Sequence, residues 1–408
     1  MAVKFTRRTF LAGSAAAIAM PAPAFAQSKP VKIGLLTVKT GPLAAGGIQM
    51  EQGTIRFLKD KNYTLAGRKV ELVVGDTGGN PAGTKTKTQE LVERDNVDMI
   101  FGPLAAFELL AISEYTAQAK MPLLSLAAAE DMTQRKPNPY FIRASATSSQ
   151  NMHPLADYAA KELKLKRVIT ISDDFAFGHE QMAGFQRVFE DAGGRVVKKL
   201  WPPLVTPDYT PYIAQISGVD AVVQGFAGSN PLKFMKQYRD AGLKLPVLGG
   251  GTACDDALLK SYGDEAVGMV SCSAYTGDLD TASNKRLIEG MVKDYGNIPG
   301  LYSAGLYING QVAEAALEKT GGKTDDREAF NQAMRSVSLT DTPRGPFTFD
   351  RFGNVVGTFY IRRCERKGDR LVNTTIKTYP KVSQFWTYDE KWFLSRPVYS
   401  RDYPPMKS

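Results

Sequence analysis

The chain has 408 residues, with 51 Lys and Arg against 42 Asp and Glu, a formal net charge of +9 and 43% hydrophobic residues. The basic residues are scattered, apart from short pairs such as Lys198-Lys199. This pattern is typical of a solvated surface and argues against a nucleic-acid partner. Three cysteines are too few for a disulfide scaffold, although one Cys254–Cys272 bridge is compatible with an oxidising compartment.

The first 26 residues have the pattern of a secretory signal. Arg7 and Arg8 precede a short, Ala-rich apolar run over 12–20, and an A-x-A-type cleavage site follows at 24–26. Paired arginines before Phe-Leu indicate the twin-arginine exporter. The alternative is an uncleaved anchor, which the weakly hydrophobic run disfavours. We therefore expect a mature chain that begins near Gln27 and works in the periplasm.

Removal of this leader takes away three basic residues and no acid, so the formal charge falls to +6. A mature chain of about 380 residues favours two domains. No later stretch is long and apolar enough to predict a transmembrane helix.

Strand-like and helix-like segments alternate in the first part of the mature chain. Apolar residues at helical spacing mark the helices, and Asn80-Pro81 is a typical helix start, with Asn as the N-cap and Pro at the first helical position. The expected strands are 31–38, 69–74, 97–101 and 121–124. The expected helices are 44–60, 81–94 and 106–119.

A second series of the same kind begins after a break at 137–143. Its expected strands are 167–171, 195–200, 221–224, 246–249 and 269–274, and its expected helices are 149–163, 178–191, 209–216, 231–241 and 256–262. Three helices over 283–295, 302–318 and 327–336 follow, then β-type pieces over 345–350, 355–364 and 370–379 and an aromatic, Pro-rich tail. This alternation predicts an α/β fold with two doubly wound parallel sheets.

Two neighbouring strands of the first series end in loops of small residues. The strand over 98–101 runs into Gly102-Pro103 and a helix start, and the strand over 121–124 runs into Ser125 to Ala129. Ligands of open α/β sheets bind at the carboxyl ends of strands, and helix N-termini there suit an anion. We expect a ligand cradle built mostly from backbone.

Catalytic and nucleotide-binding motifs are missing from the sequence. It contains no P-loop, no GxSxG elbow and no GxGxxG after a strand. His153 and His179 lie outside any cluster with metal-ligand spacing, so we expect them to be structural or exposed, and we expect neither a metal nor a cofactor.

Two further patterns have a functional and a structural interpretation. Asp173-Asp174 follows a strand and suggests a catalytic pair, but no partner base or metal is visible, and a loop leading into a helix cap is the preferred interpretation. Gly249-Gly250-Gly251 suggests phosphate binding but lacks the Lys of a phosphate loop, so we interpret it as close backbone approach to a ligand or loop.

An ordered set of short motifs resembles a known family. These are KIG at 32–34, TGP at 40–42, GDT at 75–77, NP at 80–81, FGP at 101–103, PLLS at 122–125, DDFAFG at 173–178, DAGL at 240–243 and RGPFTFDRFG at 344–353. The chain is similar to the type I periplasmic solute-binding proteins of ABC importers, in the branched-chain amino acid group. The resemblance spans most of 30–360 and implies two lobes that close on a solute like a hinged trap.

The resemblance also implies domain boundaries and site residues. Lobe one would take 29–144 and 276–346, lobe two would take 145–275 and 347–408, and the three crossovers would fall near 143–147, 274–277 and 346–350. The family's ligand contacts fall on Gly46, Ala106, Ala127, Ala129, Phe177, Ala227, Gly251 and Tyr302.

The sequence departs from amino-acid-binding members at four of these places, one of which is Ala227, where a common Tyr is missing although Phe226 stands next to it. Hydroxyl side chains are replaced by Ala106 and Ala129, and no acidic residue stands near Gly251 to pair with an α-ammonium. A buried, unpaired ammonium costs several kcal/mol. We therefore expect a ligand with an acid group and no amino group.

Aromatic side chains and backbone N–H groups complete the expected site. Phe107, Phe177, Phe226 and Tyr302 would form the wall, with the alternative that each is a core residue. The backbone of Ala106–Phe107 and of Ala127, Ala128 and Ala129 would bind the carboxylate, helped by Ser125 or Thr252. The tail segments QFWTY at 384–388 and PVYSRDYPP at 397–405 resemble a subgroup that binds aromatic acids.

Two classes of function follow. The first is a non-catalytic binding protein that delivers a small carboxylate, of benzoate or phenylpropenoid type, to an inner-membrane ABC permease; its runner-up ligand is a branched-chain amino acid or amide. The second is an exported enzyme or a ligand-sensing subunit on the same fold. The missing acid–base constellation favours the first class, and fold alone does not decide function.

Overall fold

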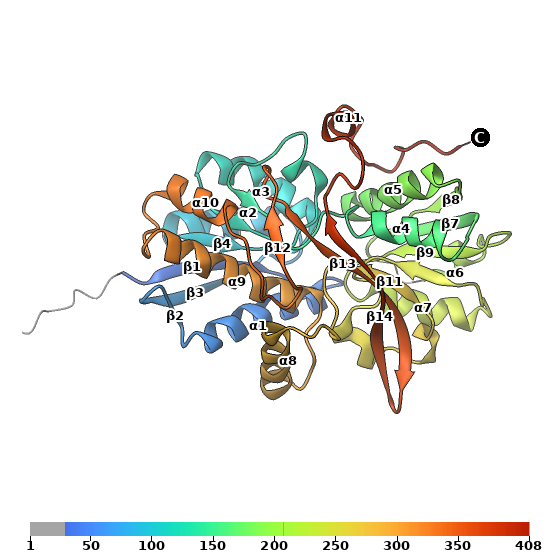
Figure 1. The fold of residues 1–408 in the computed structure, drawn as a ribbon, viewed down its shortest axis with the longest axis horizontal. Coiled ribbons are helices and arrows are strands. Elements are labelled where there is room, and N and C mark those ends of the chain that lie inside the picture. Colours follow the sequence, from blue (N-terminus) through green and yellow to red (C-terminus); the bar gives the residue numbers. More distant parts are fainter. Residues whose placement is uncertain (1–28, 207, 408) are drawn as a thin grey trace, which may run out of the picture.

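The computed structural model describes residues 29–206 and 208–407, and the expected export signal lies outside these ranges. Figure 1 shows two lobes side by side, the first coloured mainly blue, cyan and orange and the second mainly green, yellow and red. Each lobe is built on one β-sheet with helices packed against it. Among the described residues, none of the helices has both the length and the apolar character that a membrane span requires.

The first lobe has a six-stranded sheet in the order β2-β3-β1-β4-β5-β6. Its strands are parallel except for the short hairpin partner β2. The strands are β1 (Val31–Thr37), β2 (Thr64–Leu65), β3 (Arg68–Asp76), β4 (Met99–Phe101), β5 (Leu123–Leu124) and β6 (Phe141–Ile142). The helices between them are α1 (Ala44–Asp60), α2 (Pro81–Gln89), which continues as a π-helical turn (Glu90–Arg94), and α3 (Ala106–Gln118). A 3-10 turn (Glu130–Thr133) follows β5.

Three helices from late in the chain complete the first lobe. They are α8 (Ala282–Tyr295), α9 (Leu301–Lys319) and α10 (Arg327–Arg335). Helices α1 and α9 pack closely at Gly53. A Cβ at this position would lie 2.1 Å from the Ser303 carbonyl oxygen, so the missing side chain allows the close approach. Phe57 of α1 meets Tyr307 of α9 edge to face, with ring centroids 5.4 Å apart.

The second lobe has an eight-stranded sheet in the order β12-β13-β11-β10-β9-β7-β8, with β14 paired to β13. The strands are β7 (Arg167–Ser172), β8 (Arg195–Leu200), β9 (Ala221–Gly225), β10 (Val247–Gly249), β11 (Val270–Ser273), β12 (Phe347–Phe349), β13 (Val355–Lys367) and β14 (Arg370–Val382). Its helices are α4 (Met152–Lys161), α5 (Ala176–Asp191), α6 (Thr210–Ile213) and α7 (Asn230–Asp240). A 3-10 turn (Asp256–Ser261) stands where a helix is expected over 256–262, and a second 3-10 turn (Asp264–Ala266) follows it.

The second sheet has the expected parallel core, to which the three late β-type segments add antiparallel strands. Strands β7 to β11 are parallel, but β13 runs antiparallel to β11, and both β12 and β14 run antiparallel to β13. The antiparallel pairing of β14 with β13 follows from the short connection between them, which contains Gly368 with a φ of +64°. Two residues can join antiparallel strands but cannot make a parallel crossover.

The chain passes between the lobes three times: after β6, after β11 and before β12. Two buried arginines hold these crossings together. The Arg344 guanidinium donates to the Ala144 carbonyl oxygen at 2.6 Å. Arg143 pairs through its backbone with the start of β13, where its N–H donates to the Gly353 carbonyl oxygen at 2.9 Å. The crossings place the carboxyl ends of both sheets opposite each other.

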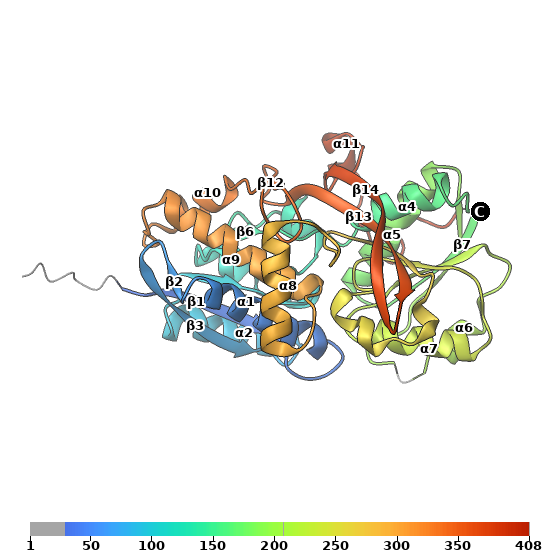
Figure 2. The same cartoon turned by 60° about the horizontal axis from the view of Figure 1, so that its bottom comes forward.

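The tail after β14 contains α11 (Glu390–Leu394) and contacts both lobes, because Arg135 of the first lobe donates to the Phe393 carbonyl oxygen at 3.0 Å. Phe385, Phe393 and Tyr399 form a small buried cluster that includes Ala183 of α5. Figure 2 shows α11 above the lobes, with the tail continuing beside α5.

The cysteines are buried free thiols. Cys254 and Cys364 share one core cluster, whereas Cys272 lies in another, so the arrangement does not support the Cys254–Cys272 bridge.

Candidate ligand-binding site

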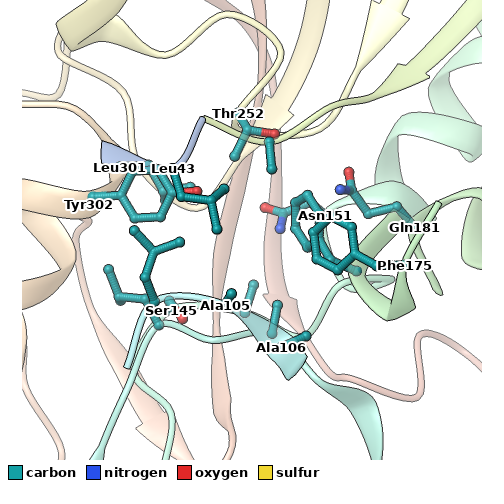
Figure 3. A pocket seen from close by; sticks show the side chains of 17 residues that line it. Leu43, Ala105, Ala106, Ser145, Asn151, Phe175, Gln181, Thr252, Leu301 and Tyr302 are labelled. Atoms are coloured by element: carbon teal, nitrogen blue, oxygen red, sulfur yellow. The ribbon is translucent and has the colours of Figure 1, made fainter. Parts of the chain in front are cut away.

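A cavity lies where the ends of the two sheets face each other. It encloses about 630 Å³ of space free of atoms, including its open mouth, and seventeen residues line it (Figure 3). The first lobe contributes Leu43, Leu104, Ala105, Ala106, Leu126, Ala128, Leu301 and Tyr302, and the rest of the lining is Ser145, Ala146, Asn151, Phe175, Phe177, Gln181, Ala227, Gly251 and Thr252. Every one of these side chains is neutral.

The first turn of α3 presents backbone N–H groups at the cavity. Ala105 is the N-cap in extended conformation, and Ala106 begins the helix. The buried Glu108 carboxylate turns back to accept the Ala105 N–H at 2.9 Å. The N–H groups of the first helical turn have no carbonyl partner within the helix, and the helix dipole favours negative charge there. This corner is the part of the cavity best suited to an anion.

Glu108 also accepts hydrogen bonds from Thr77 and Thr84, and burial raises its pKa. These bonds keep its carboxylate on the protein side of the turn, so that it does not line the cavity.

The loop after β5 is held by its own hydroxyl group and by the crossover. Ser125 Oγ donates to the Pro103 carbonyl oxygen at 2.6 Å and accepts the Ala127 N–H at 2.9 Å. The Ala128 carbonyl oxygen accepts the Ser148 N–H at 2.9 Å. Ala128 therefore faces the cavity, while Ser125 is committed to the loop itself.

An aromatic wall comes from the start of α5. Phe175 stacks on Phe177 with centroids 5.9 Å apart, and Phe107 meets Phe175 edge to face at 5.5 Å. Figure 3 shows Phe175 facing Tyr302 across the cavity. A flat, apolar group between these rings buries its faces against aromatic surface.

Asp173 shapes the second lobe's side of the cavity without lining it. Its carboxylate accepts the Ala227 N–H at 2.7 Å and the Asn230 side-chain amide at 2.8 Å. Burial raises the pKa of Asp173 to about 7. Its neighbour Asp174 pairs with His179 at 2.7 Å and with Arg401 at 3.0 Å. Both aspartates hold loops in place, which agrees with the preferred structural interpretation of this pair.

The three glycines at the end of β10 and directly after it stand where neighbouring groups approach closely. A Cβ at Gly250 would lie 2.5 Å from Gln181 Oε1, and a Cβ at Gly251 would lie 2.9 Å from Ser273 Oγ. Gly251 lines the cavity, and its carbonyl oxygen accepts from Arg362 at 3.3 Å. Arg362 in turn forms a buried ion pair with Asp256 at 2.7 Å, which holds the loop.

The structure brings about half of the expected site residues to the cavity. Those that line it are Ala106, Ala128, Phe177, Ala227, Gly251, Thr252 and Tyr302. The others stand behind the wall or in the core: Gly46, Phe107, Ser125, Ala127, Ala129 and Phe226. Gly46 leaves room for two residues of the cavity lining, because a Cβ there would lie 2.8 Å from Leu104 Cδ1 and 3.1 Å from the Tyr302 ring.

Phe226 corrects the expectation of an aromatic on the wall. It is fully buried in the second lobe's core, with centroids 5.1 Å from Tyr209 and 5.0 Å from Phe234. The Phe226 side chain, directly after β9, points into the core, and the next residue, Ala227, lines the cavity. Thr252 lines the cavity, but its hydroxyl donates to the Phe226 carbonyl oxygen at 2.7 Å.

Ten of the seventeen lining residues were not among the expected site residues, and four of these ten are polar or aromatic: Ser145, Asn151, Phe175 and Gln181. Phe175 stands two residues before Phe177 in the same motif, and Gln181 stands four residues after Phe177 and hence on the same helix face. Helical spacing is the signal that identifies Gln181. Ser145 lies in a crossover with no regular pattern, and Asn151 stands directly before α4, inside the helix expected over 149–163. Neither position carries a signal for ligand binding.

Comparison with known proteins places the chain in a family. The family model described as "periplasmic binding protein" matches residues 30–369. The chain belongs to the periplasmic binding protein family. This family consists of transport proteins that bind solutes for ABC transporters, which agrees with the two-lobed fold. The family assignment implies a periplasmic location and a permease partner.

Two kinds of relative stand out. The Leu/Ile/Val-binding protein homolog 6 of Brucella suis biovar 1 (strain 1330) is 29% identical over 384 residues, covering 91% of this chain and 97% of the relative. Among solved structures, the solute-binding protein of an ABC transporter from Rhodopseudomonas palustris BisB5, in complex with 3,4-dihydroxybenzoic acid, is 32% identical with a TM-score of 0.83, covering 87% and 98%. A solute-binding protein from R. palustris in complex with 4-hydroxybenzoate is 28% identical with a TM-score of 0.82, covering 88% and 99%.

Proposed function

We propose that this periplasmic binding protein captures a small aromatic carboxylic acid between its lobes and delivers it to an inner-membrane ABC permease after export by the twin-arginine pathway. The observation that carries the proposal is the neutral lining of the cavity next to the first turn of α3. A carboxylate fits N–H groups at a helix start without a cationic partner. The stacked Phe175 and Phe177 suit the faces of a benzene ring.

The branched-chain amino acids are the runner-up ligands, because the Brucella suis relative is named a Leu/Ile/Val-binding protein homolog. An amino acid brings an α-ammonium group, and none of the lining side chains is acidic. Two buried carboxylates stand close to the cavity without lining it, and both already have partners. Asp173 accepts from Ala227 and Asn230. Asp255 accepts the Leu301 N–H at 3.0 Å and the Gln49 side-chain amide at 3.4 Å. A buried ammonium left unpaired costs several kcal/mol. This argument favours an acid without an amino group, as in the two R. palustris complexes.

A ligand panel tests the proposal. Purified protein lacking residues 1–26 is titrated by calorimetry with benzoate, hydroxybenzoates and a phenylpropenoid acid, and in parallel with leucine, isoleucine and urea. A ligand present at 100 times its Kd stabilises the native state by about 2.7 kcal/mol, so thermal shift gives a second readout. The proposal expects binding of at least one aromatic acid and none of leucine. Binding of leucine together with failure of every aromatic acid would overturn it.

A further inference from the structure

Two carboxamide side chains face the cavity with polar atoms that lack a partner. Within the described part of the chain, Asn151 Oδ1 and Gln181 Nε2 are buried and make no hydrogen bond. Gln181 as a whole is only 2% exposed. A buried donor or acceptor without a partner costs about 1–3 kcal/mol. A pair of such atoms in one cavity indicates that the missing partner is the ligand.

The local structure holds both side chains in these positions. Asn is among the best N-cap residues, yet Asn151 precedes α4 without making a side-chain cap hydrogen bond, so its carboxamide is left for the cavity. Gln181 lies alongside Gly250, where a Cβ would come within 2.5 Å of Gln181 Oε1. The glycine thus leaves the space that the Gln181 carboxamide occupies. Figure 3 shows both carboxamides on the Phe175 side of the cavity, away from Tyr302 and Leu301.

The two atoms define the chemistry of the group that fits between them. Asn151 Oδ1 accepts a hydrogen bond and Gln181 Nε2 donates one. A hydroxyl group donates one hydrogen bond and accepts others, so it satisfies both atoms. An ammonium cannot accept from Gln181, a carboxylate cannot donate to Asn151, and a bare ring does neither. If the O and N atoms are exchanged in both carboxamides, Asn151 donates and Gln181 accepts, so a hydroxyl group still satisfies both side chains.

We infer that Asn151 and Gln181 bind a ring hydroxyl of the ligand and make the site selective for hydroxylated aromatic acids over unsubstituted ones. This inference rests on the proposed function, in which the first turn of α3 binds the carboxylate. Asn151 and Gln181 come from the second lobe, so the hydroxyl links the second lobe to a ligand that the first lobe holds by its acid group. A site built to bond a hydroxyl rejects the analogue that lacks it, because its polar groups are then left buried and unpaired.

The test compares matched ligands on matched variants. Calorimetry measures the affinity of the wild type, Gln181→Met and Asn151→Leu for benzoate and for 3-hydroxybenzoate, 4-hydroxybenzoate and 3,4-dihydroxybenzoate. The wild type is expected to bind at least one hydroxylated acid about tenfold or more tightly than benzoate, which corresponds to 1.4 kcal/mol. Each variant is expected to bring that ratio below about threefold, because only the hydroxylated acids lose a hydrogen bond to the missing carboxamide.

Gln186→Met is the control on the same helix. Gln186 is also buried, but its side-chain amide donates to the Pro405 carbonyl oxygen at 3.0 Å, away from the cavity. This variant is expected to keep the wild-type ratio even where its thermal stability falls. Thermal melts identify any variant that does not fold, and either of the two cavity variants alone suffices for the comparison.

The outcomes separate this inference from the proposed function. Aromatic acids that bind the wild type with no preference for any hydroxylated ligand overturn the inference and leave the proposed function standing. A preference that persists in both Gln181→Met and Asn151→Leu also overturns it, and assigns the selectivity to other groups. Equal losses for benzoate and its hydroxylated analogues in the variants indicate a bound water between the carboxamides and count against the inference. Failure of every aromatic acid overturns both.

Discussion

Glu130 of the first lobe donates its backbone N–H to the carboxylate oxygen Oε1 of Glu180 in the second lobe, at 3.2 Å. Both carboxyl groups are buried, and the crossover between the lobes supplies their other partners. Ser148 Oγ donates to Glu180 at 2.6 Å, and the Ser149 N–H donates to Glu130 at 2.7 Å. Arg143 is the cation that faces the pair. Two carboxyl groups thus meet where the lobes join.

The pair predicts a loss of stability at alkaline pH. Burial raises the pKa of Glu180, and the nearby Glu130 raises it further; burial also raises the pKa of Glu130. The native state therefore keeps a proton above pH 4.5 that the unfolded chain has released, so stability falls as pH rises through that window. At pH 8 we expect the free energy of unfolding of Glu180→Gln to exceed that of the wild type by about 1 kcal/mol or more. This difference in stability is expected to shrink as the pH is lowered toward 4.5.

Denaturant unfolding at pH 5 and pH 8 measures this difference. Glu162→Gln is the control, because Glu162 is a surface residue paired with Lys377. It is expected to follow the wild-type pH dependence. A Glu180→Gln protein with the same difference from the wild type at both pH values would show that the pair does not hold a proton.

Gly251 provides a test of the charge of the ligand. Gly251→Glu places a carboxylate at a cavity whose lining is neutral, and Gly251→Gln adds the same bulk without the charge. Both variants crowd Ser273 and Leu301 equally. Because like charges about 4 Å apart repel by about 1–4 kcal/mol, the Glu variant is expected to bind an aromatic acid at least tenfold more weakly than the Gln variant at pH 8. Equal affinities by calorimetry would place the carboxylate far from Gly251.

Phe175 and Phe226 should separate binding from stability. Phe175→Leu removes a ring from the cavity wall, and we expect aromatic-acid affinity to fall about tenfold through lost ring contacts and burial. Phe226→Leu acts in the core and is expected to lower the free energy of unfolding by about 2 kcal/mol with ligand affinity within about threefold of the wild type. Calorimetry and denaturant unfolding of both variants check this. A larger affinity loss for Phe226→Leu than for Phe175→Leu would contradict the placement of Phe175 on the cavity wall and Phe226 in the core.

His153 predicts a loss of stability in acid. Its ring is buried beside Trp386, Phe393 and Tyr399, and burial lowers its pKa to about 3. Below about pH 6.5 the imidazole is protonated in the unfolded chain but stays neutral in the native state. The free energy of unfolding therefore falls as pH drops from 6.5 toward 3. Between pH 7 and pH 5, we expect the melting temperature of His153→Phe to fall by less than that of the wild type. An identical loss would assign the acid sensitivity to other groups.

Much of the fold is predictable from local pattern. The helix over 44–60 is found with those bounds, and Asn80 caps α2 by accepting the Gly83 N–H at 2.9 Å. These features depend on helical spacing and cap chemistry, which a short window of sequence contains. The short strands β2 and β6 were not predicted, because two residues carry no periodic signal.

The site is less predictable than the fold. Phe226 and Ala227 are adjacent, and only one of them faces the cavity, which the packing of Tyr209 and Phe234 decides. Asn151 and Gln181 approach the cavity from two helices, and Gly250, about 70 residues from Gln181 along the chain, makes room for one of them. No property of a single segment predicts such a meeting.

The sequence by itself determined the α/β alternation, the export signal as an expectation, the resemblance to the family and the uncharged residues at 106, 129 and 251, because each depends on residue types and their order. The tertiary structure alone decided which side chains face the cavity, that the Ser125 and Thr252 hydroxyl groups bond to backbone carbonyl oxygens, and that β12 to β14 pair antiparallel in the second sheet. It also brought Glu130 and Glu180 together from different lobes. The physical reason is that burial and hydrogen-bond partners arise from long-range packing, which a local pattern does not contain.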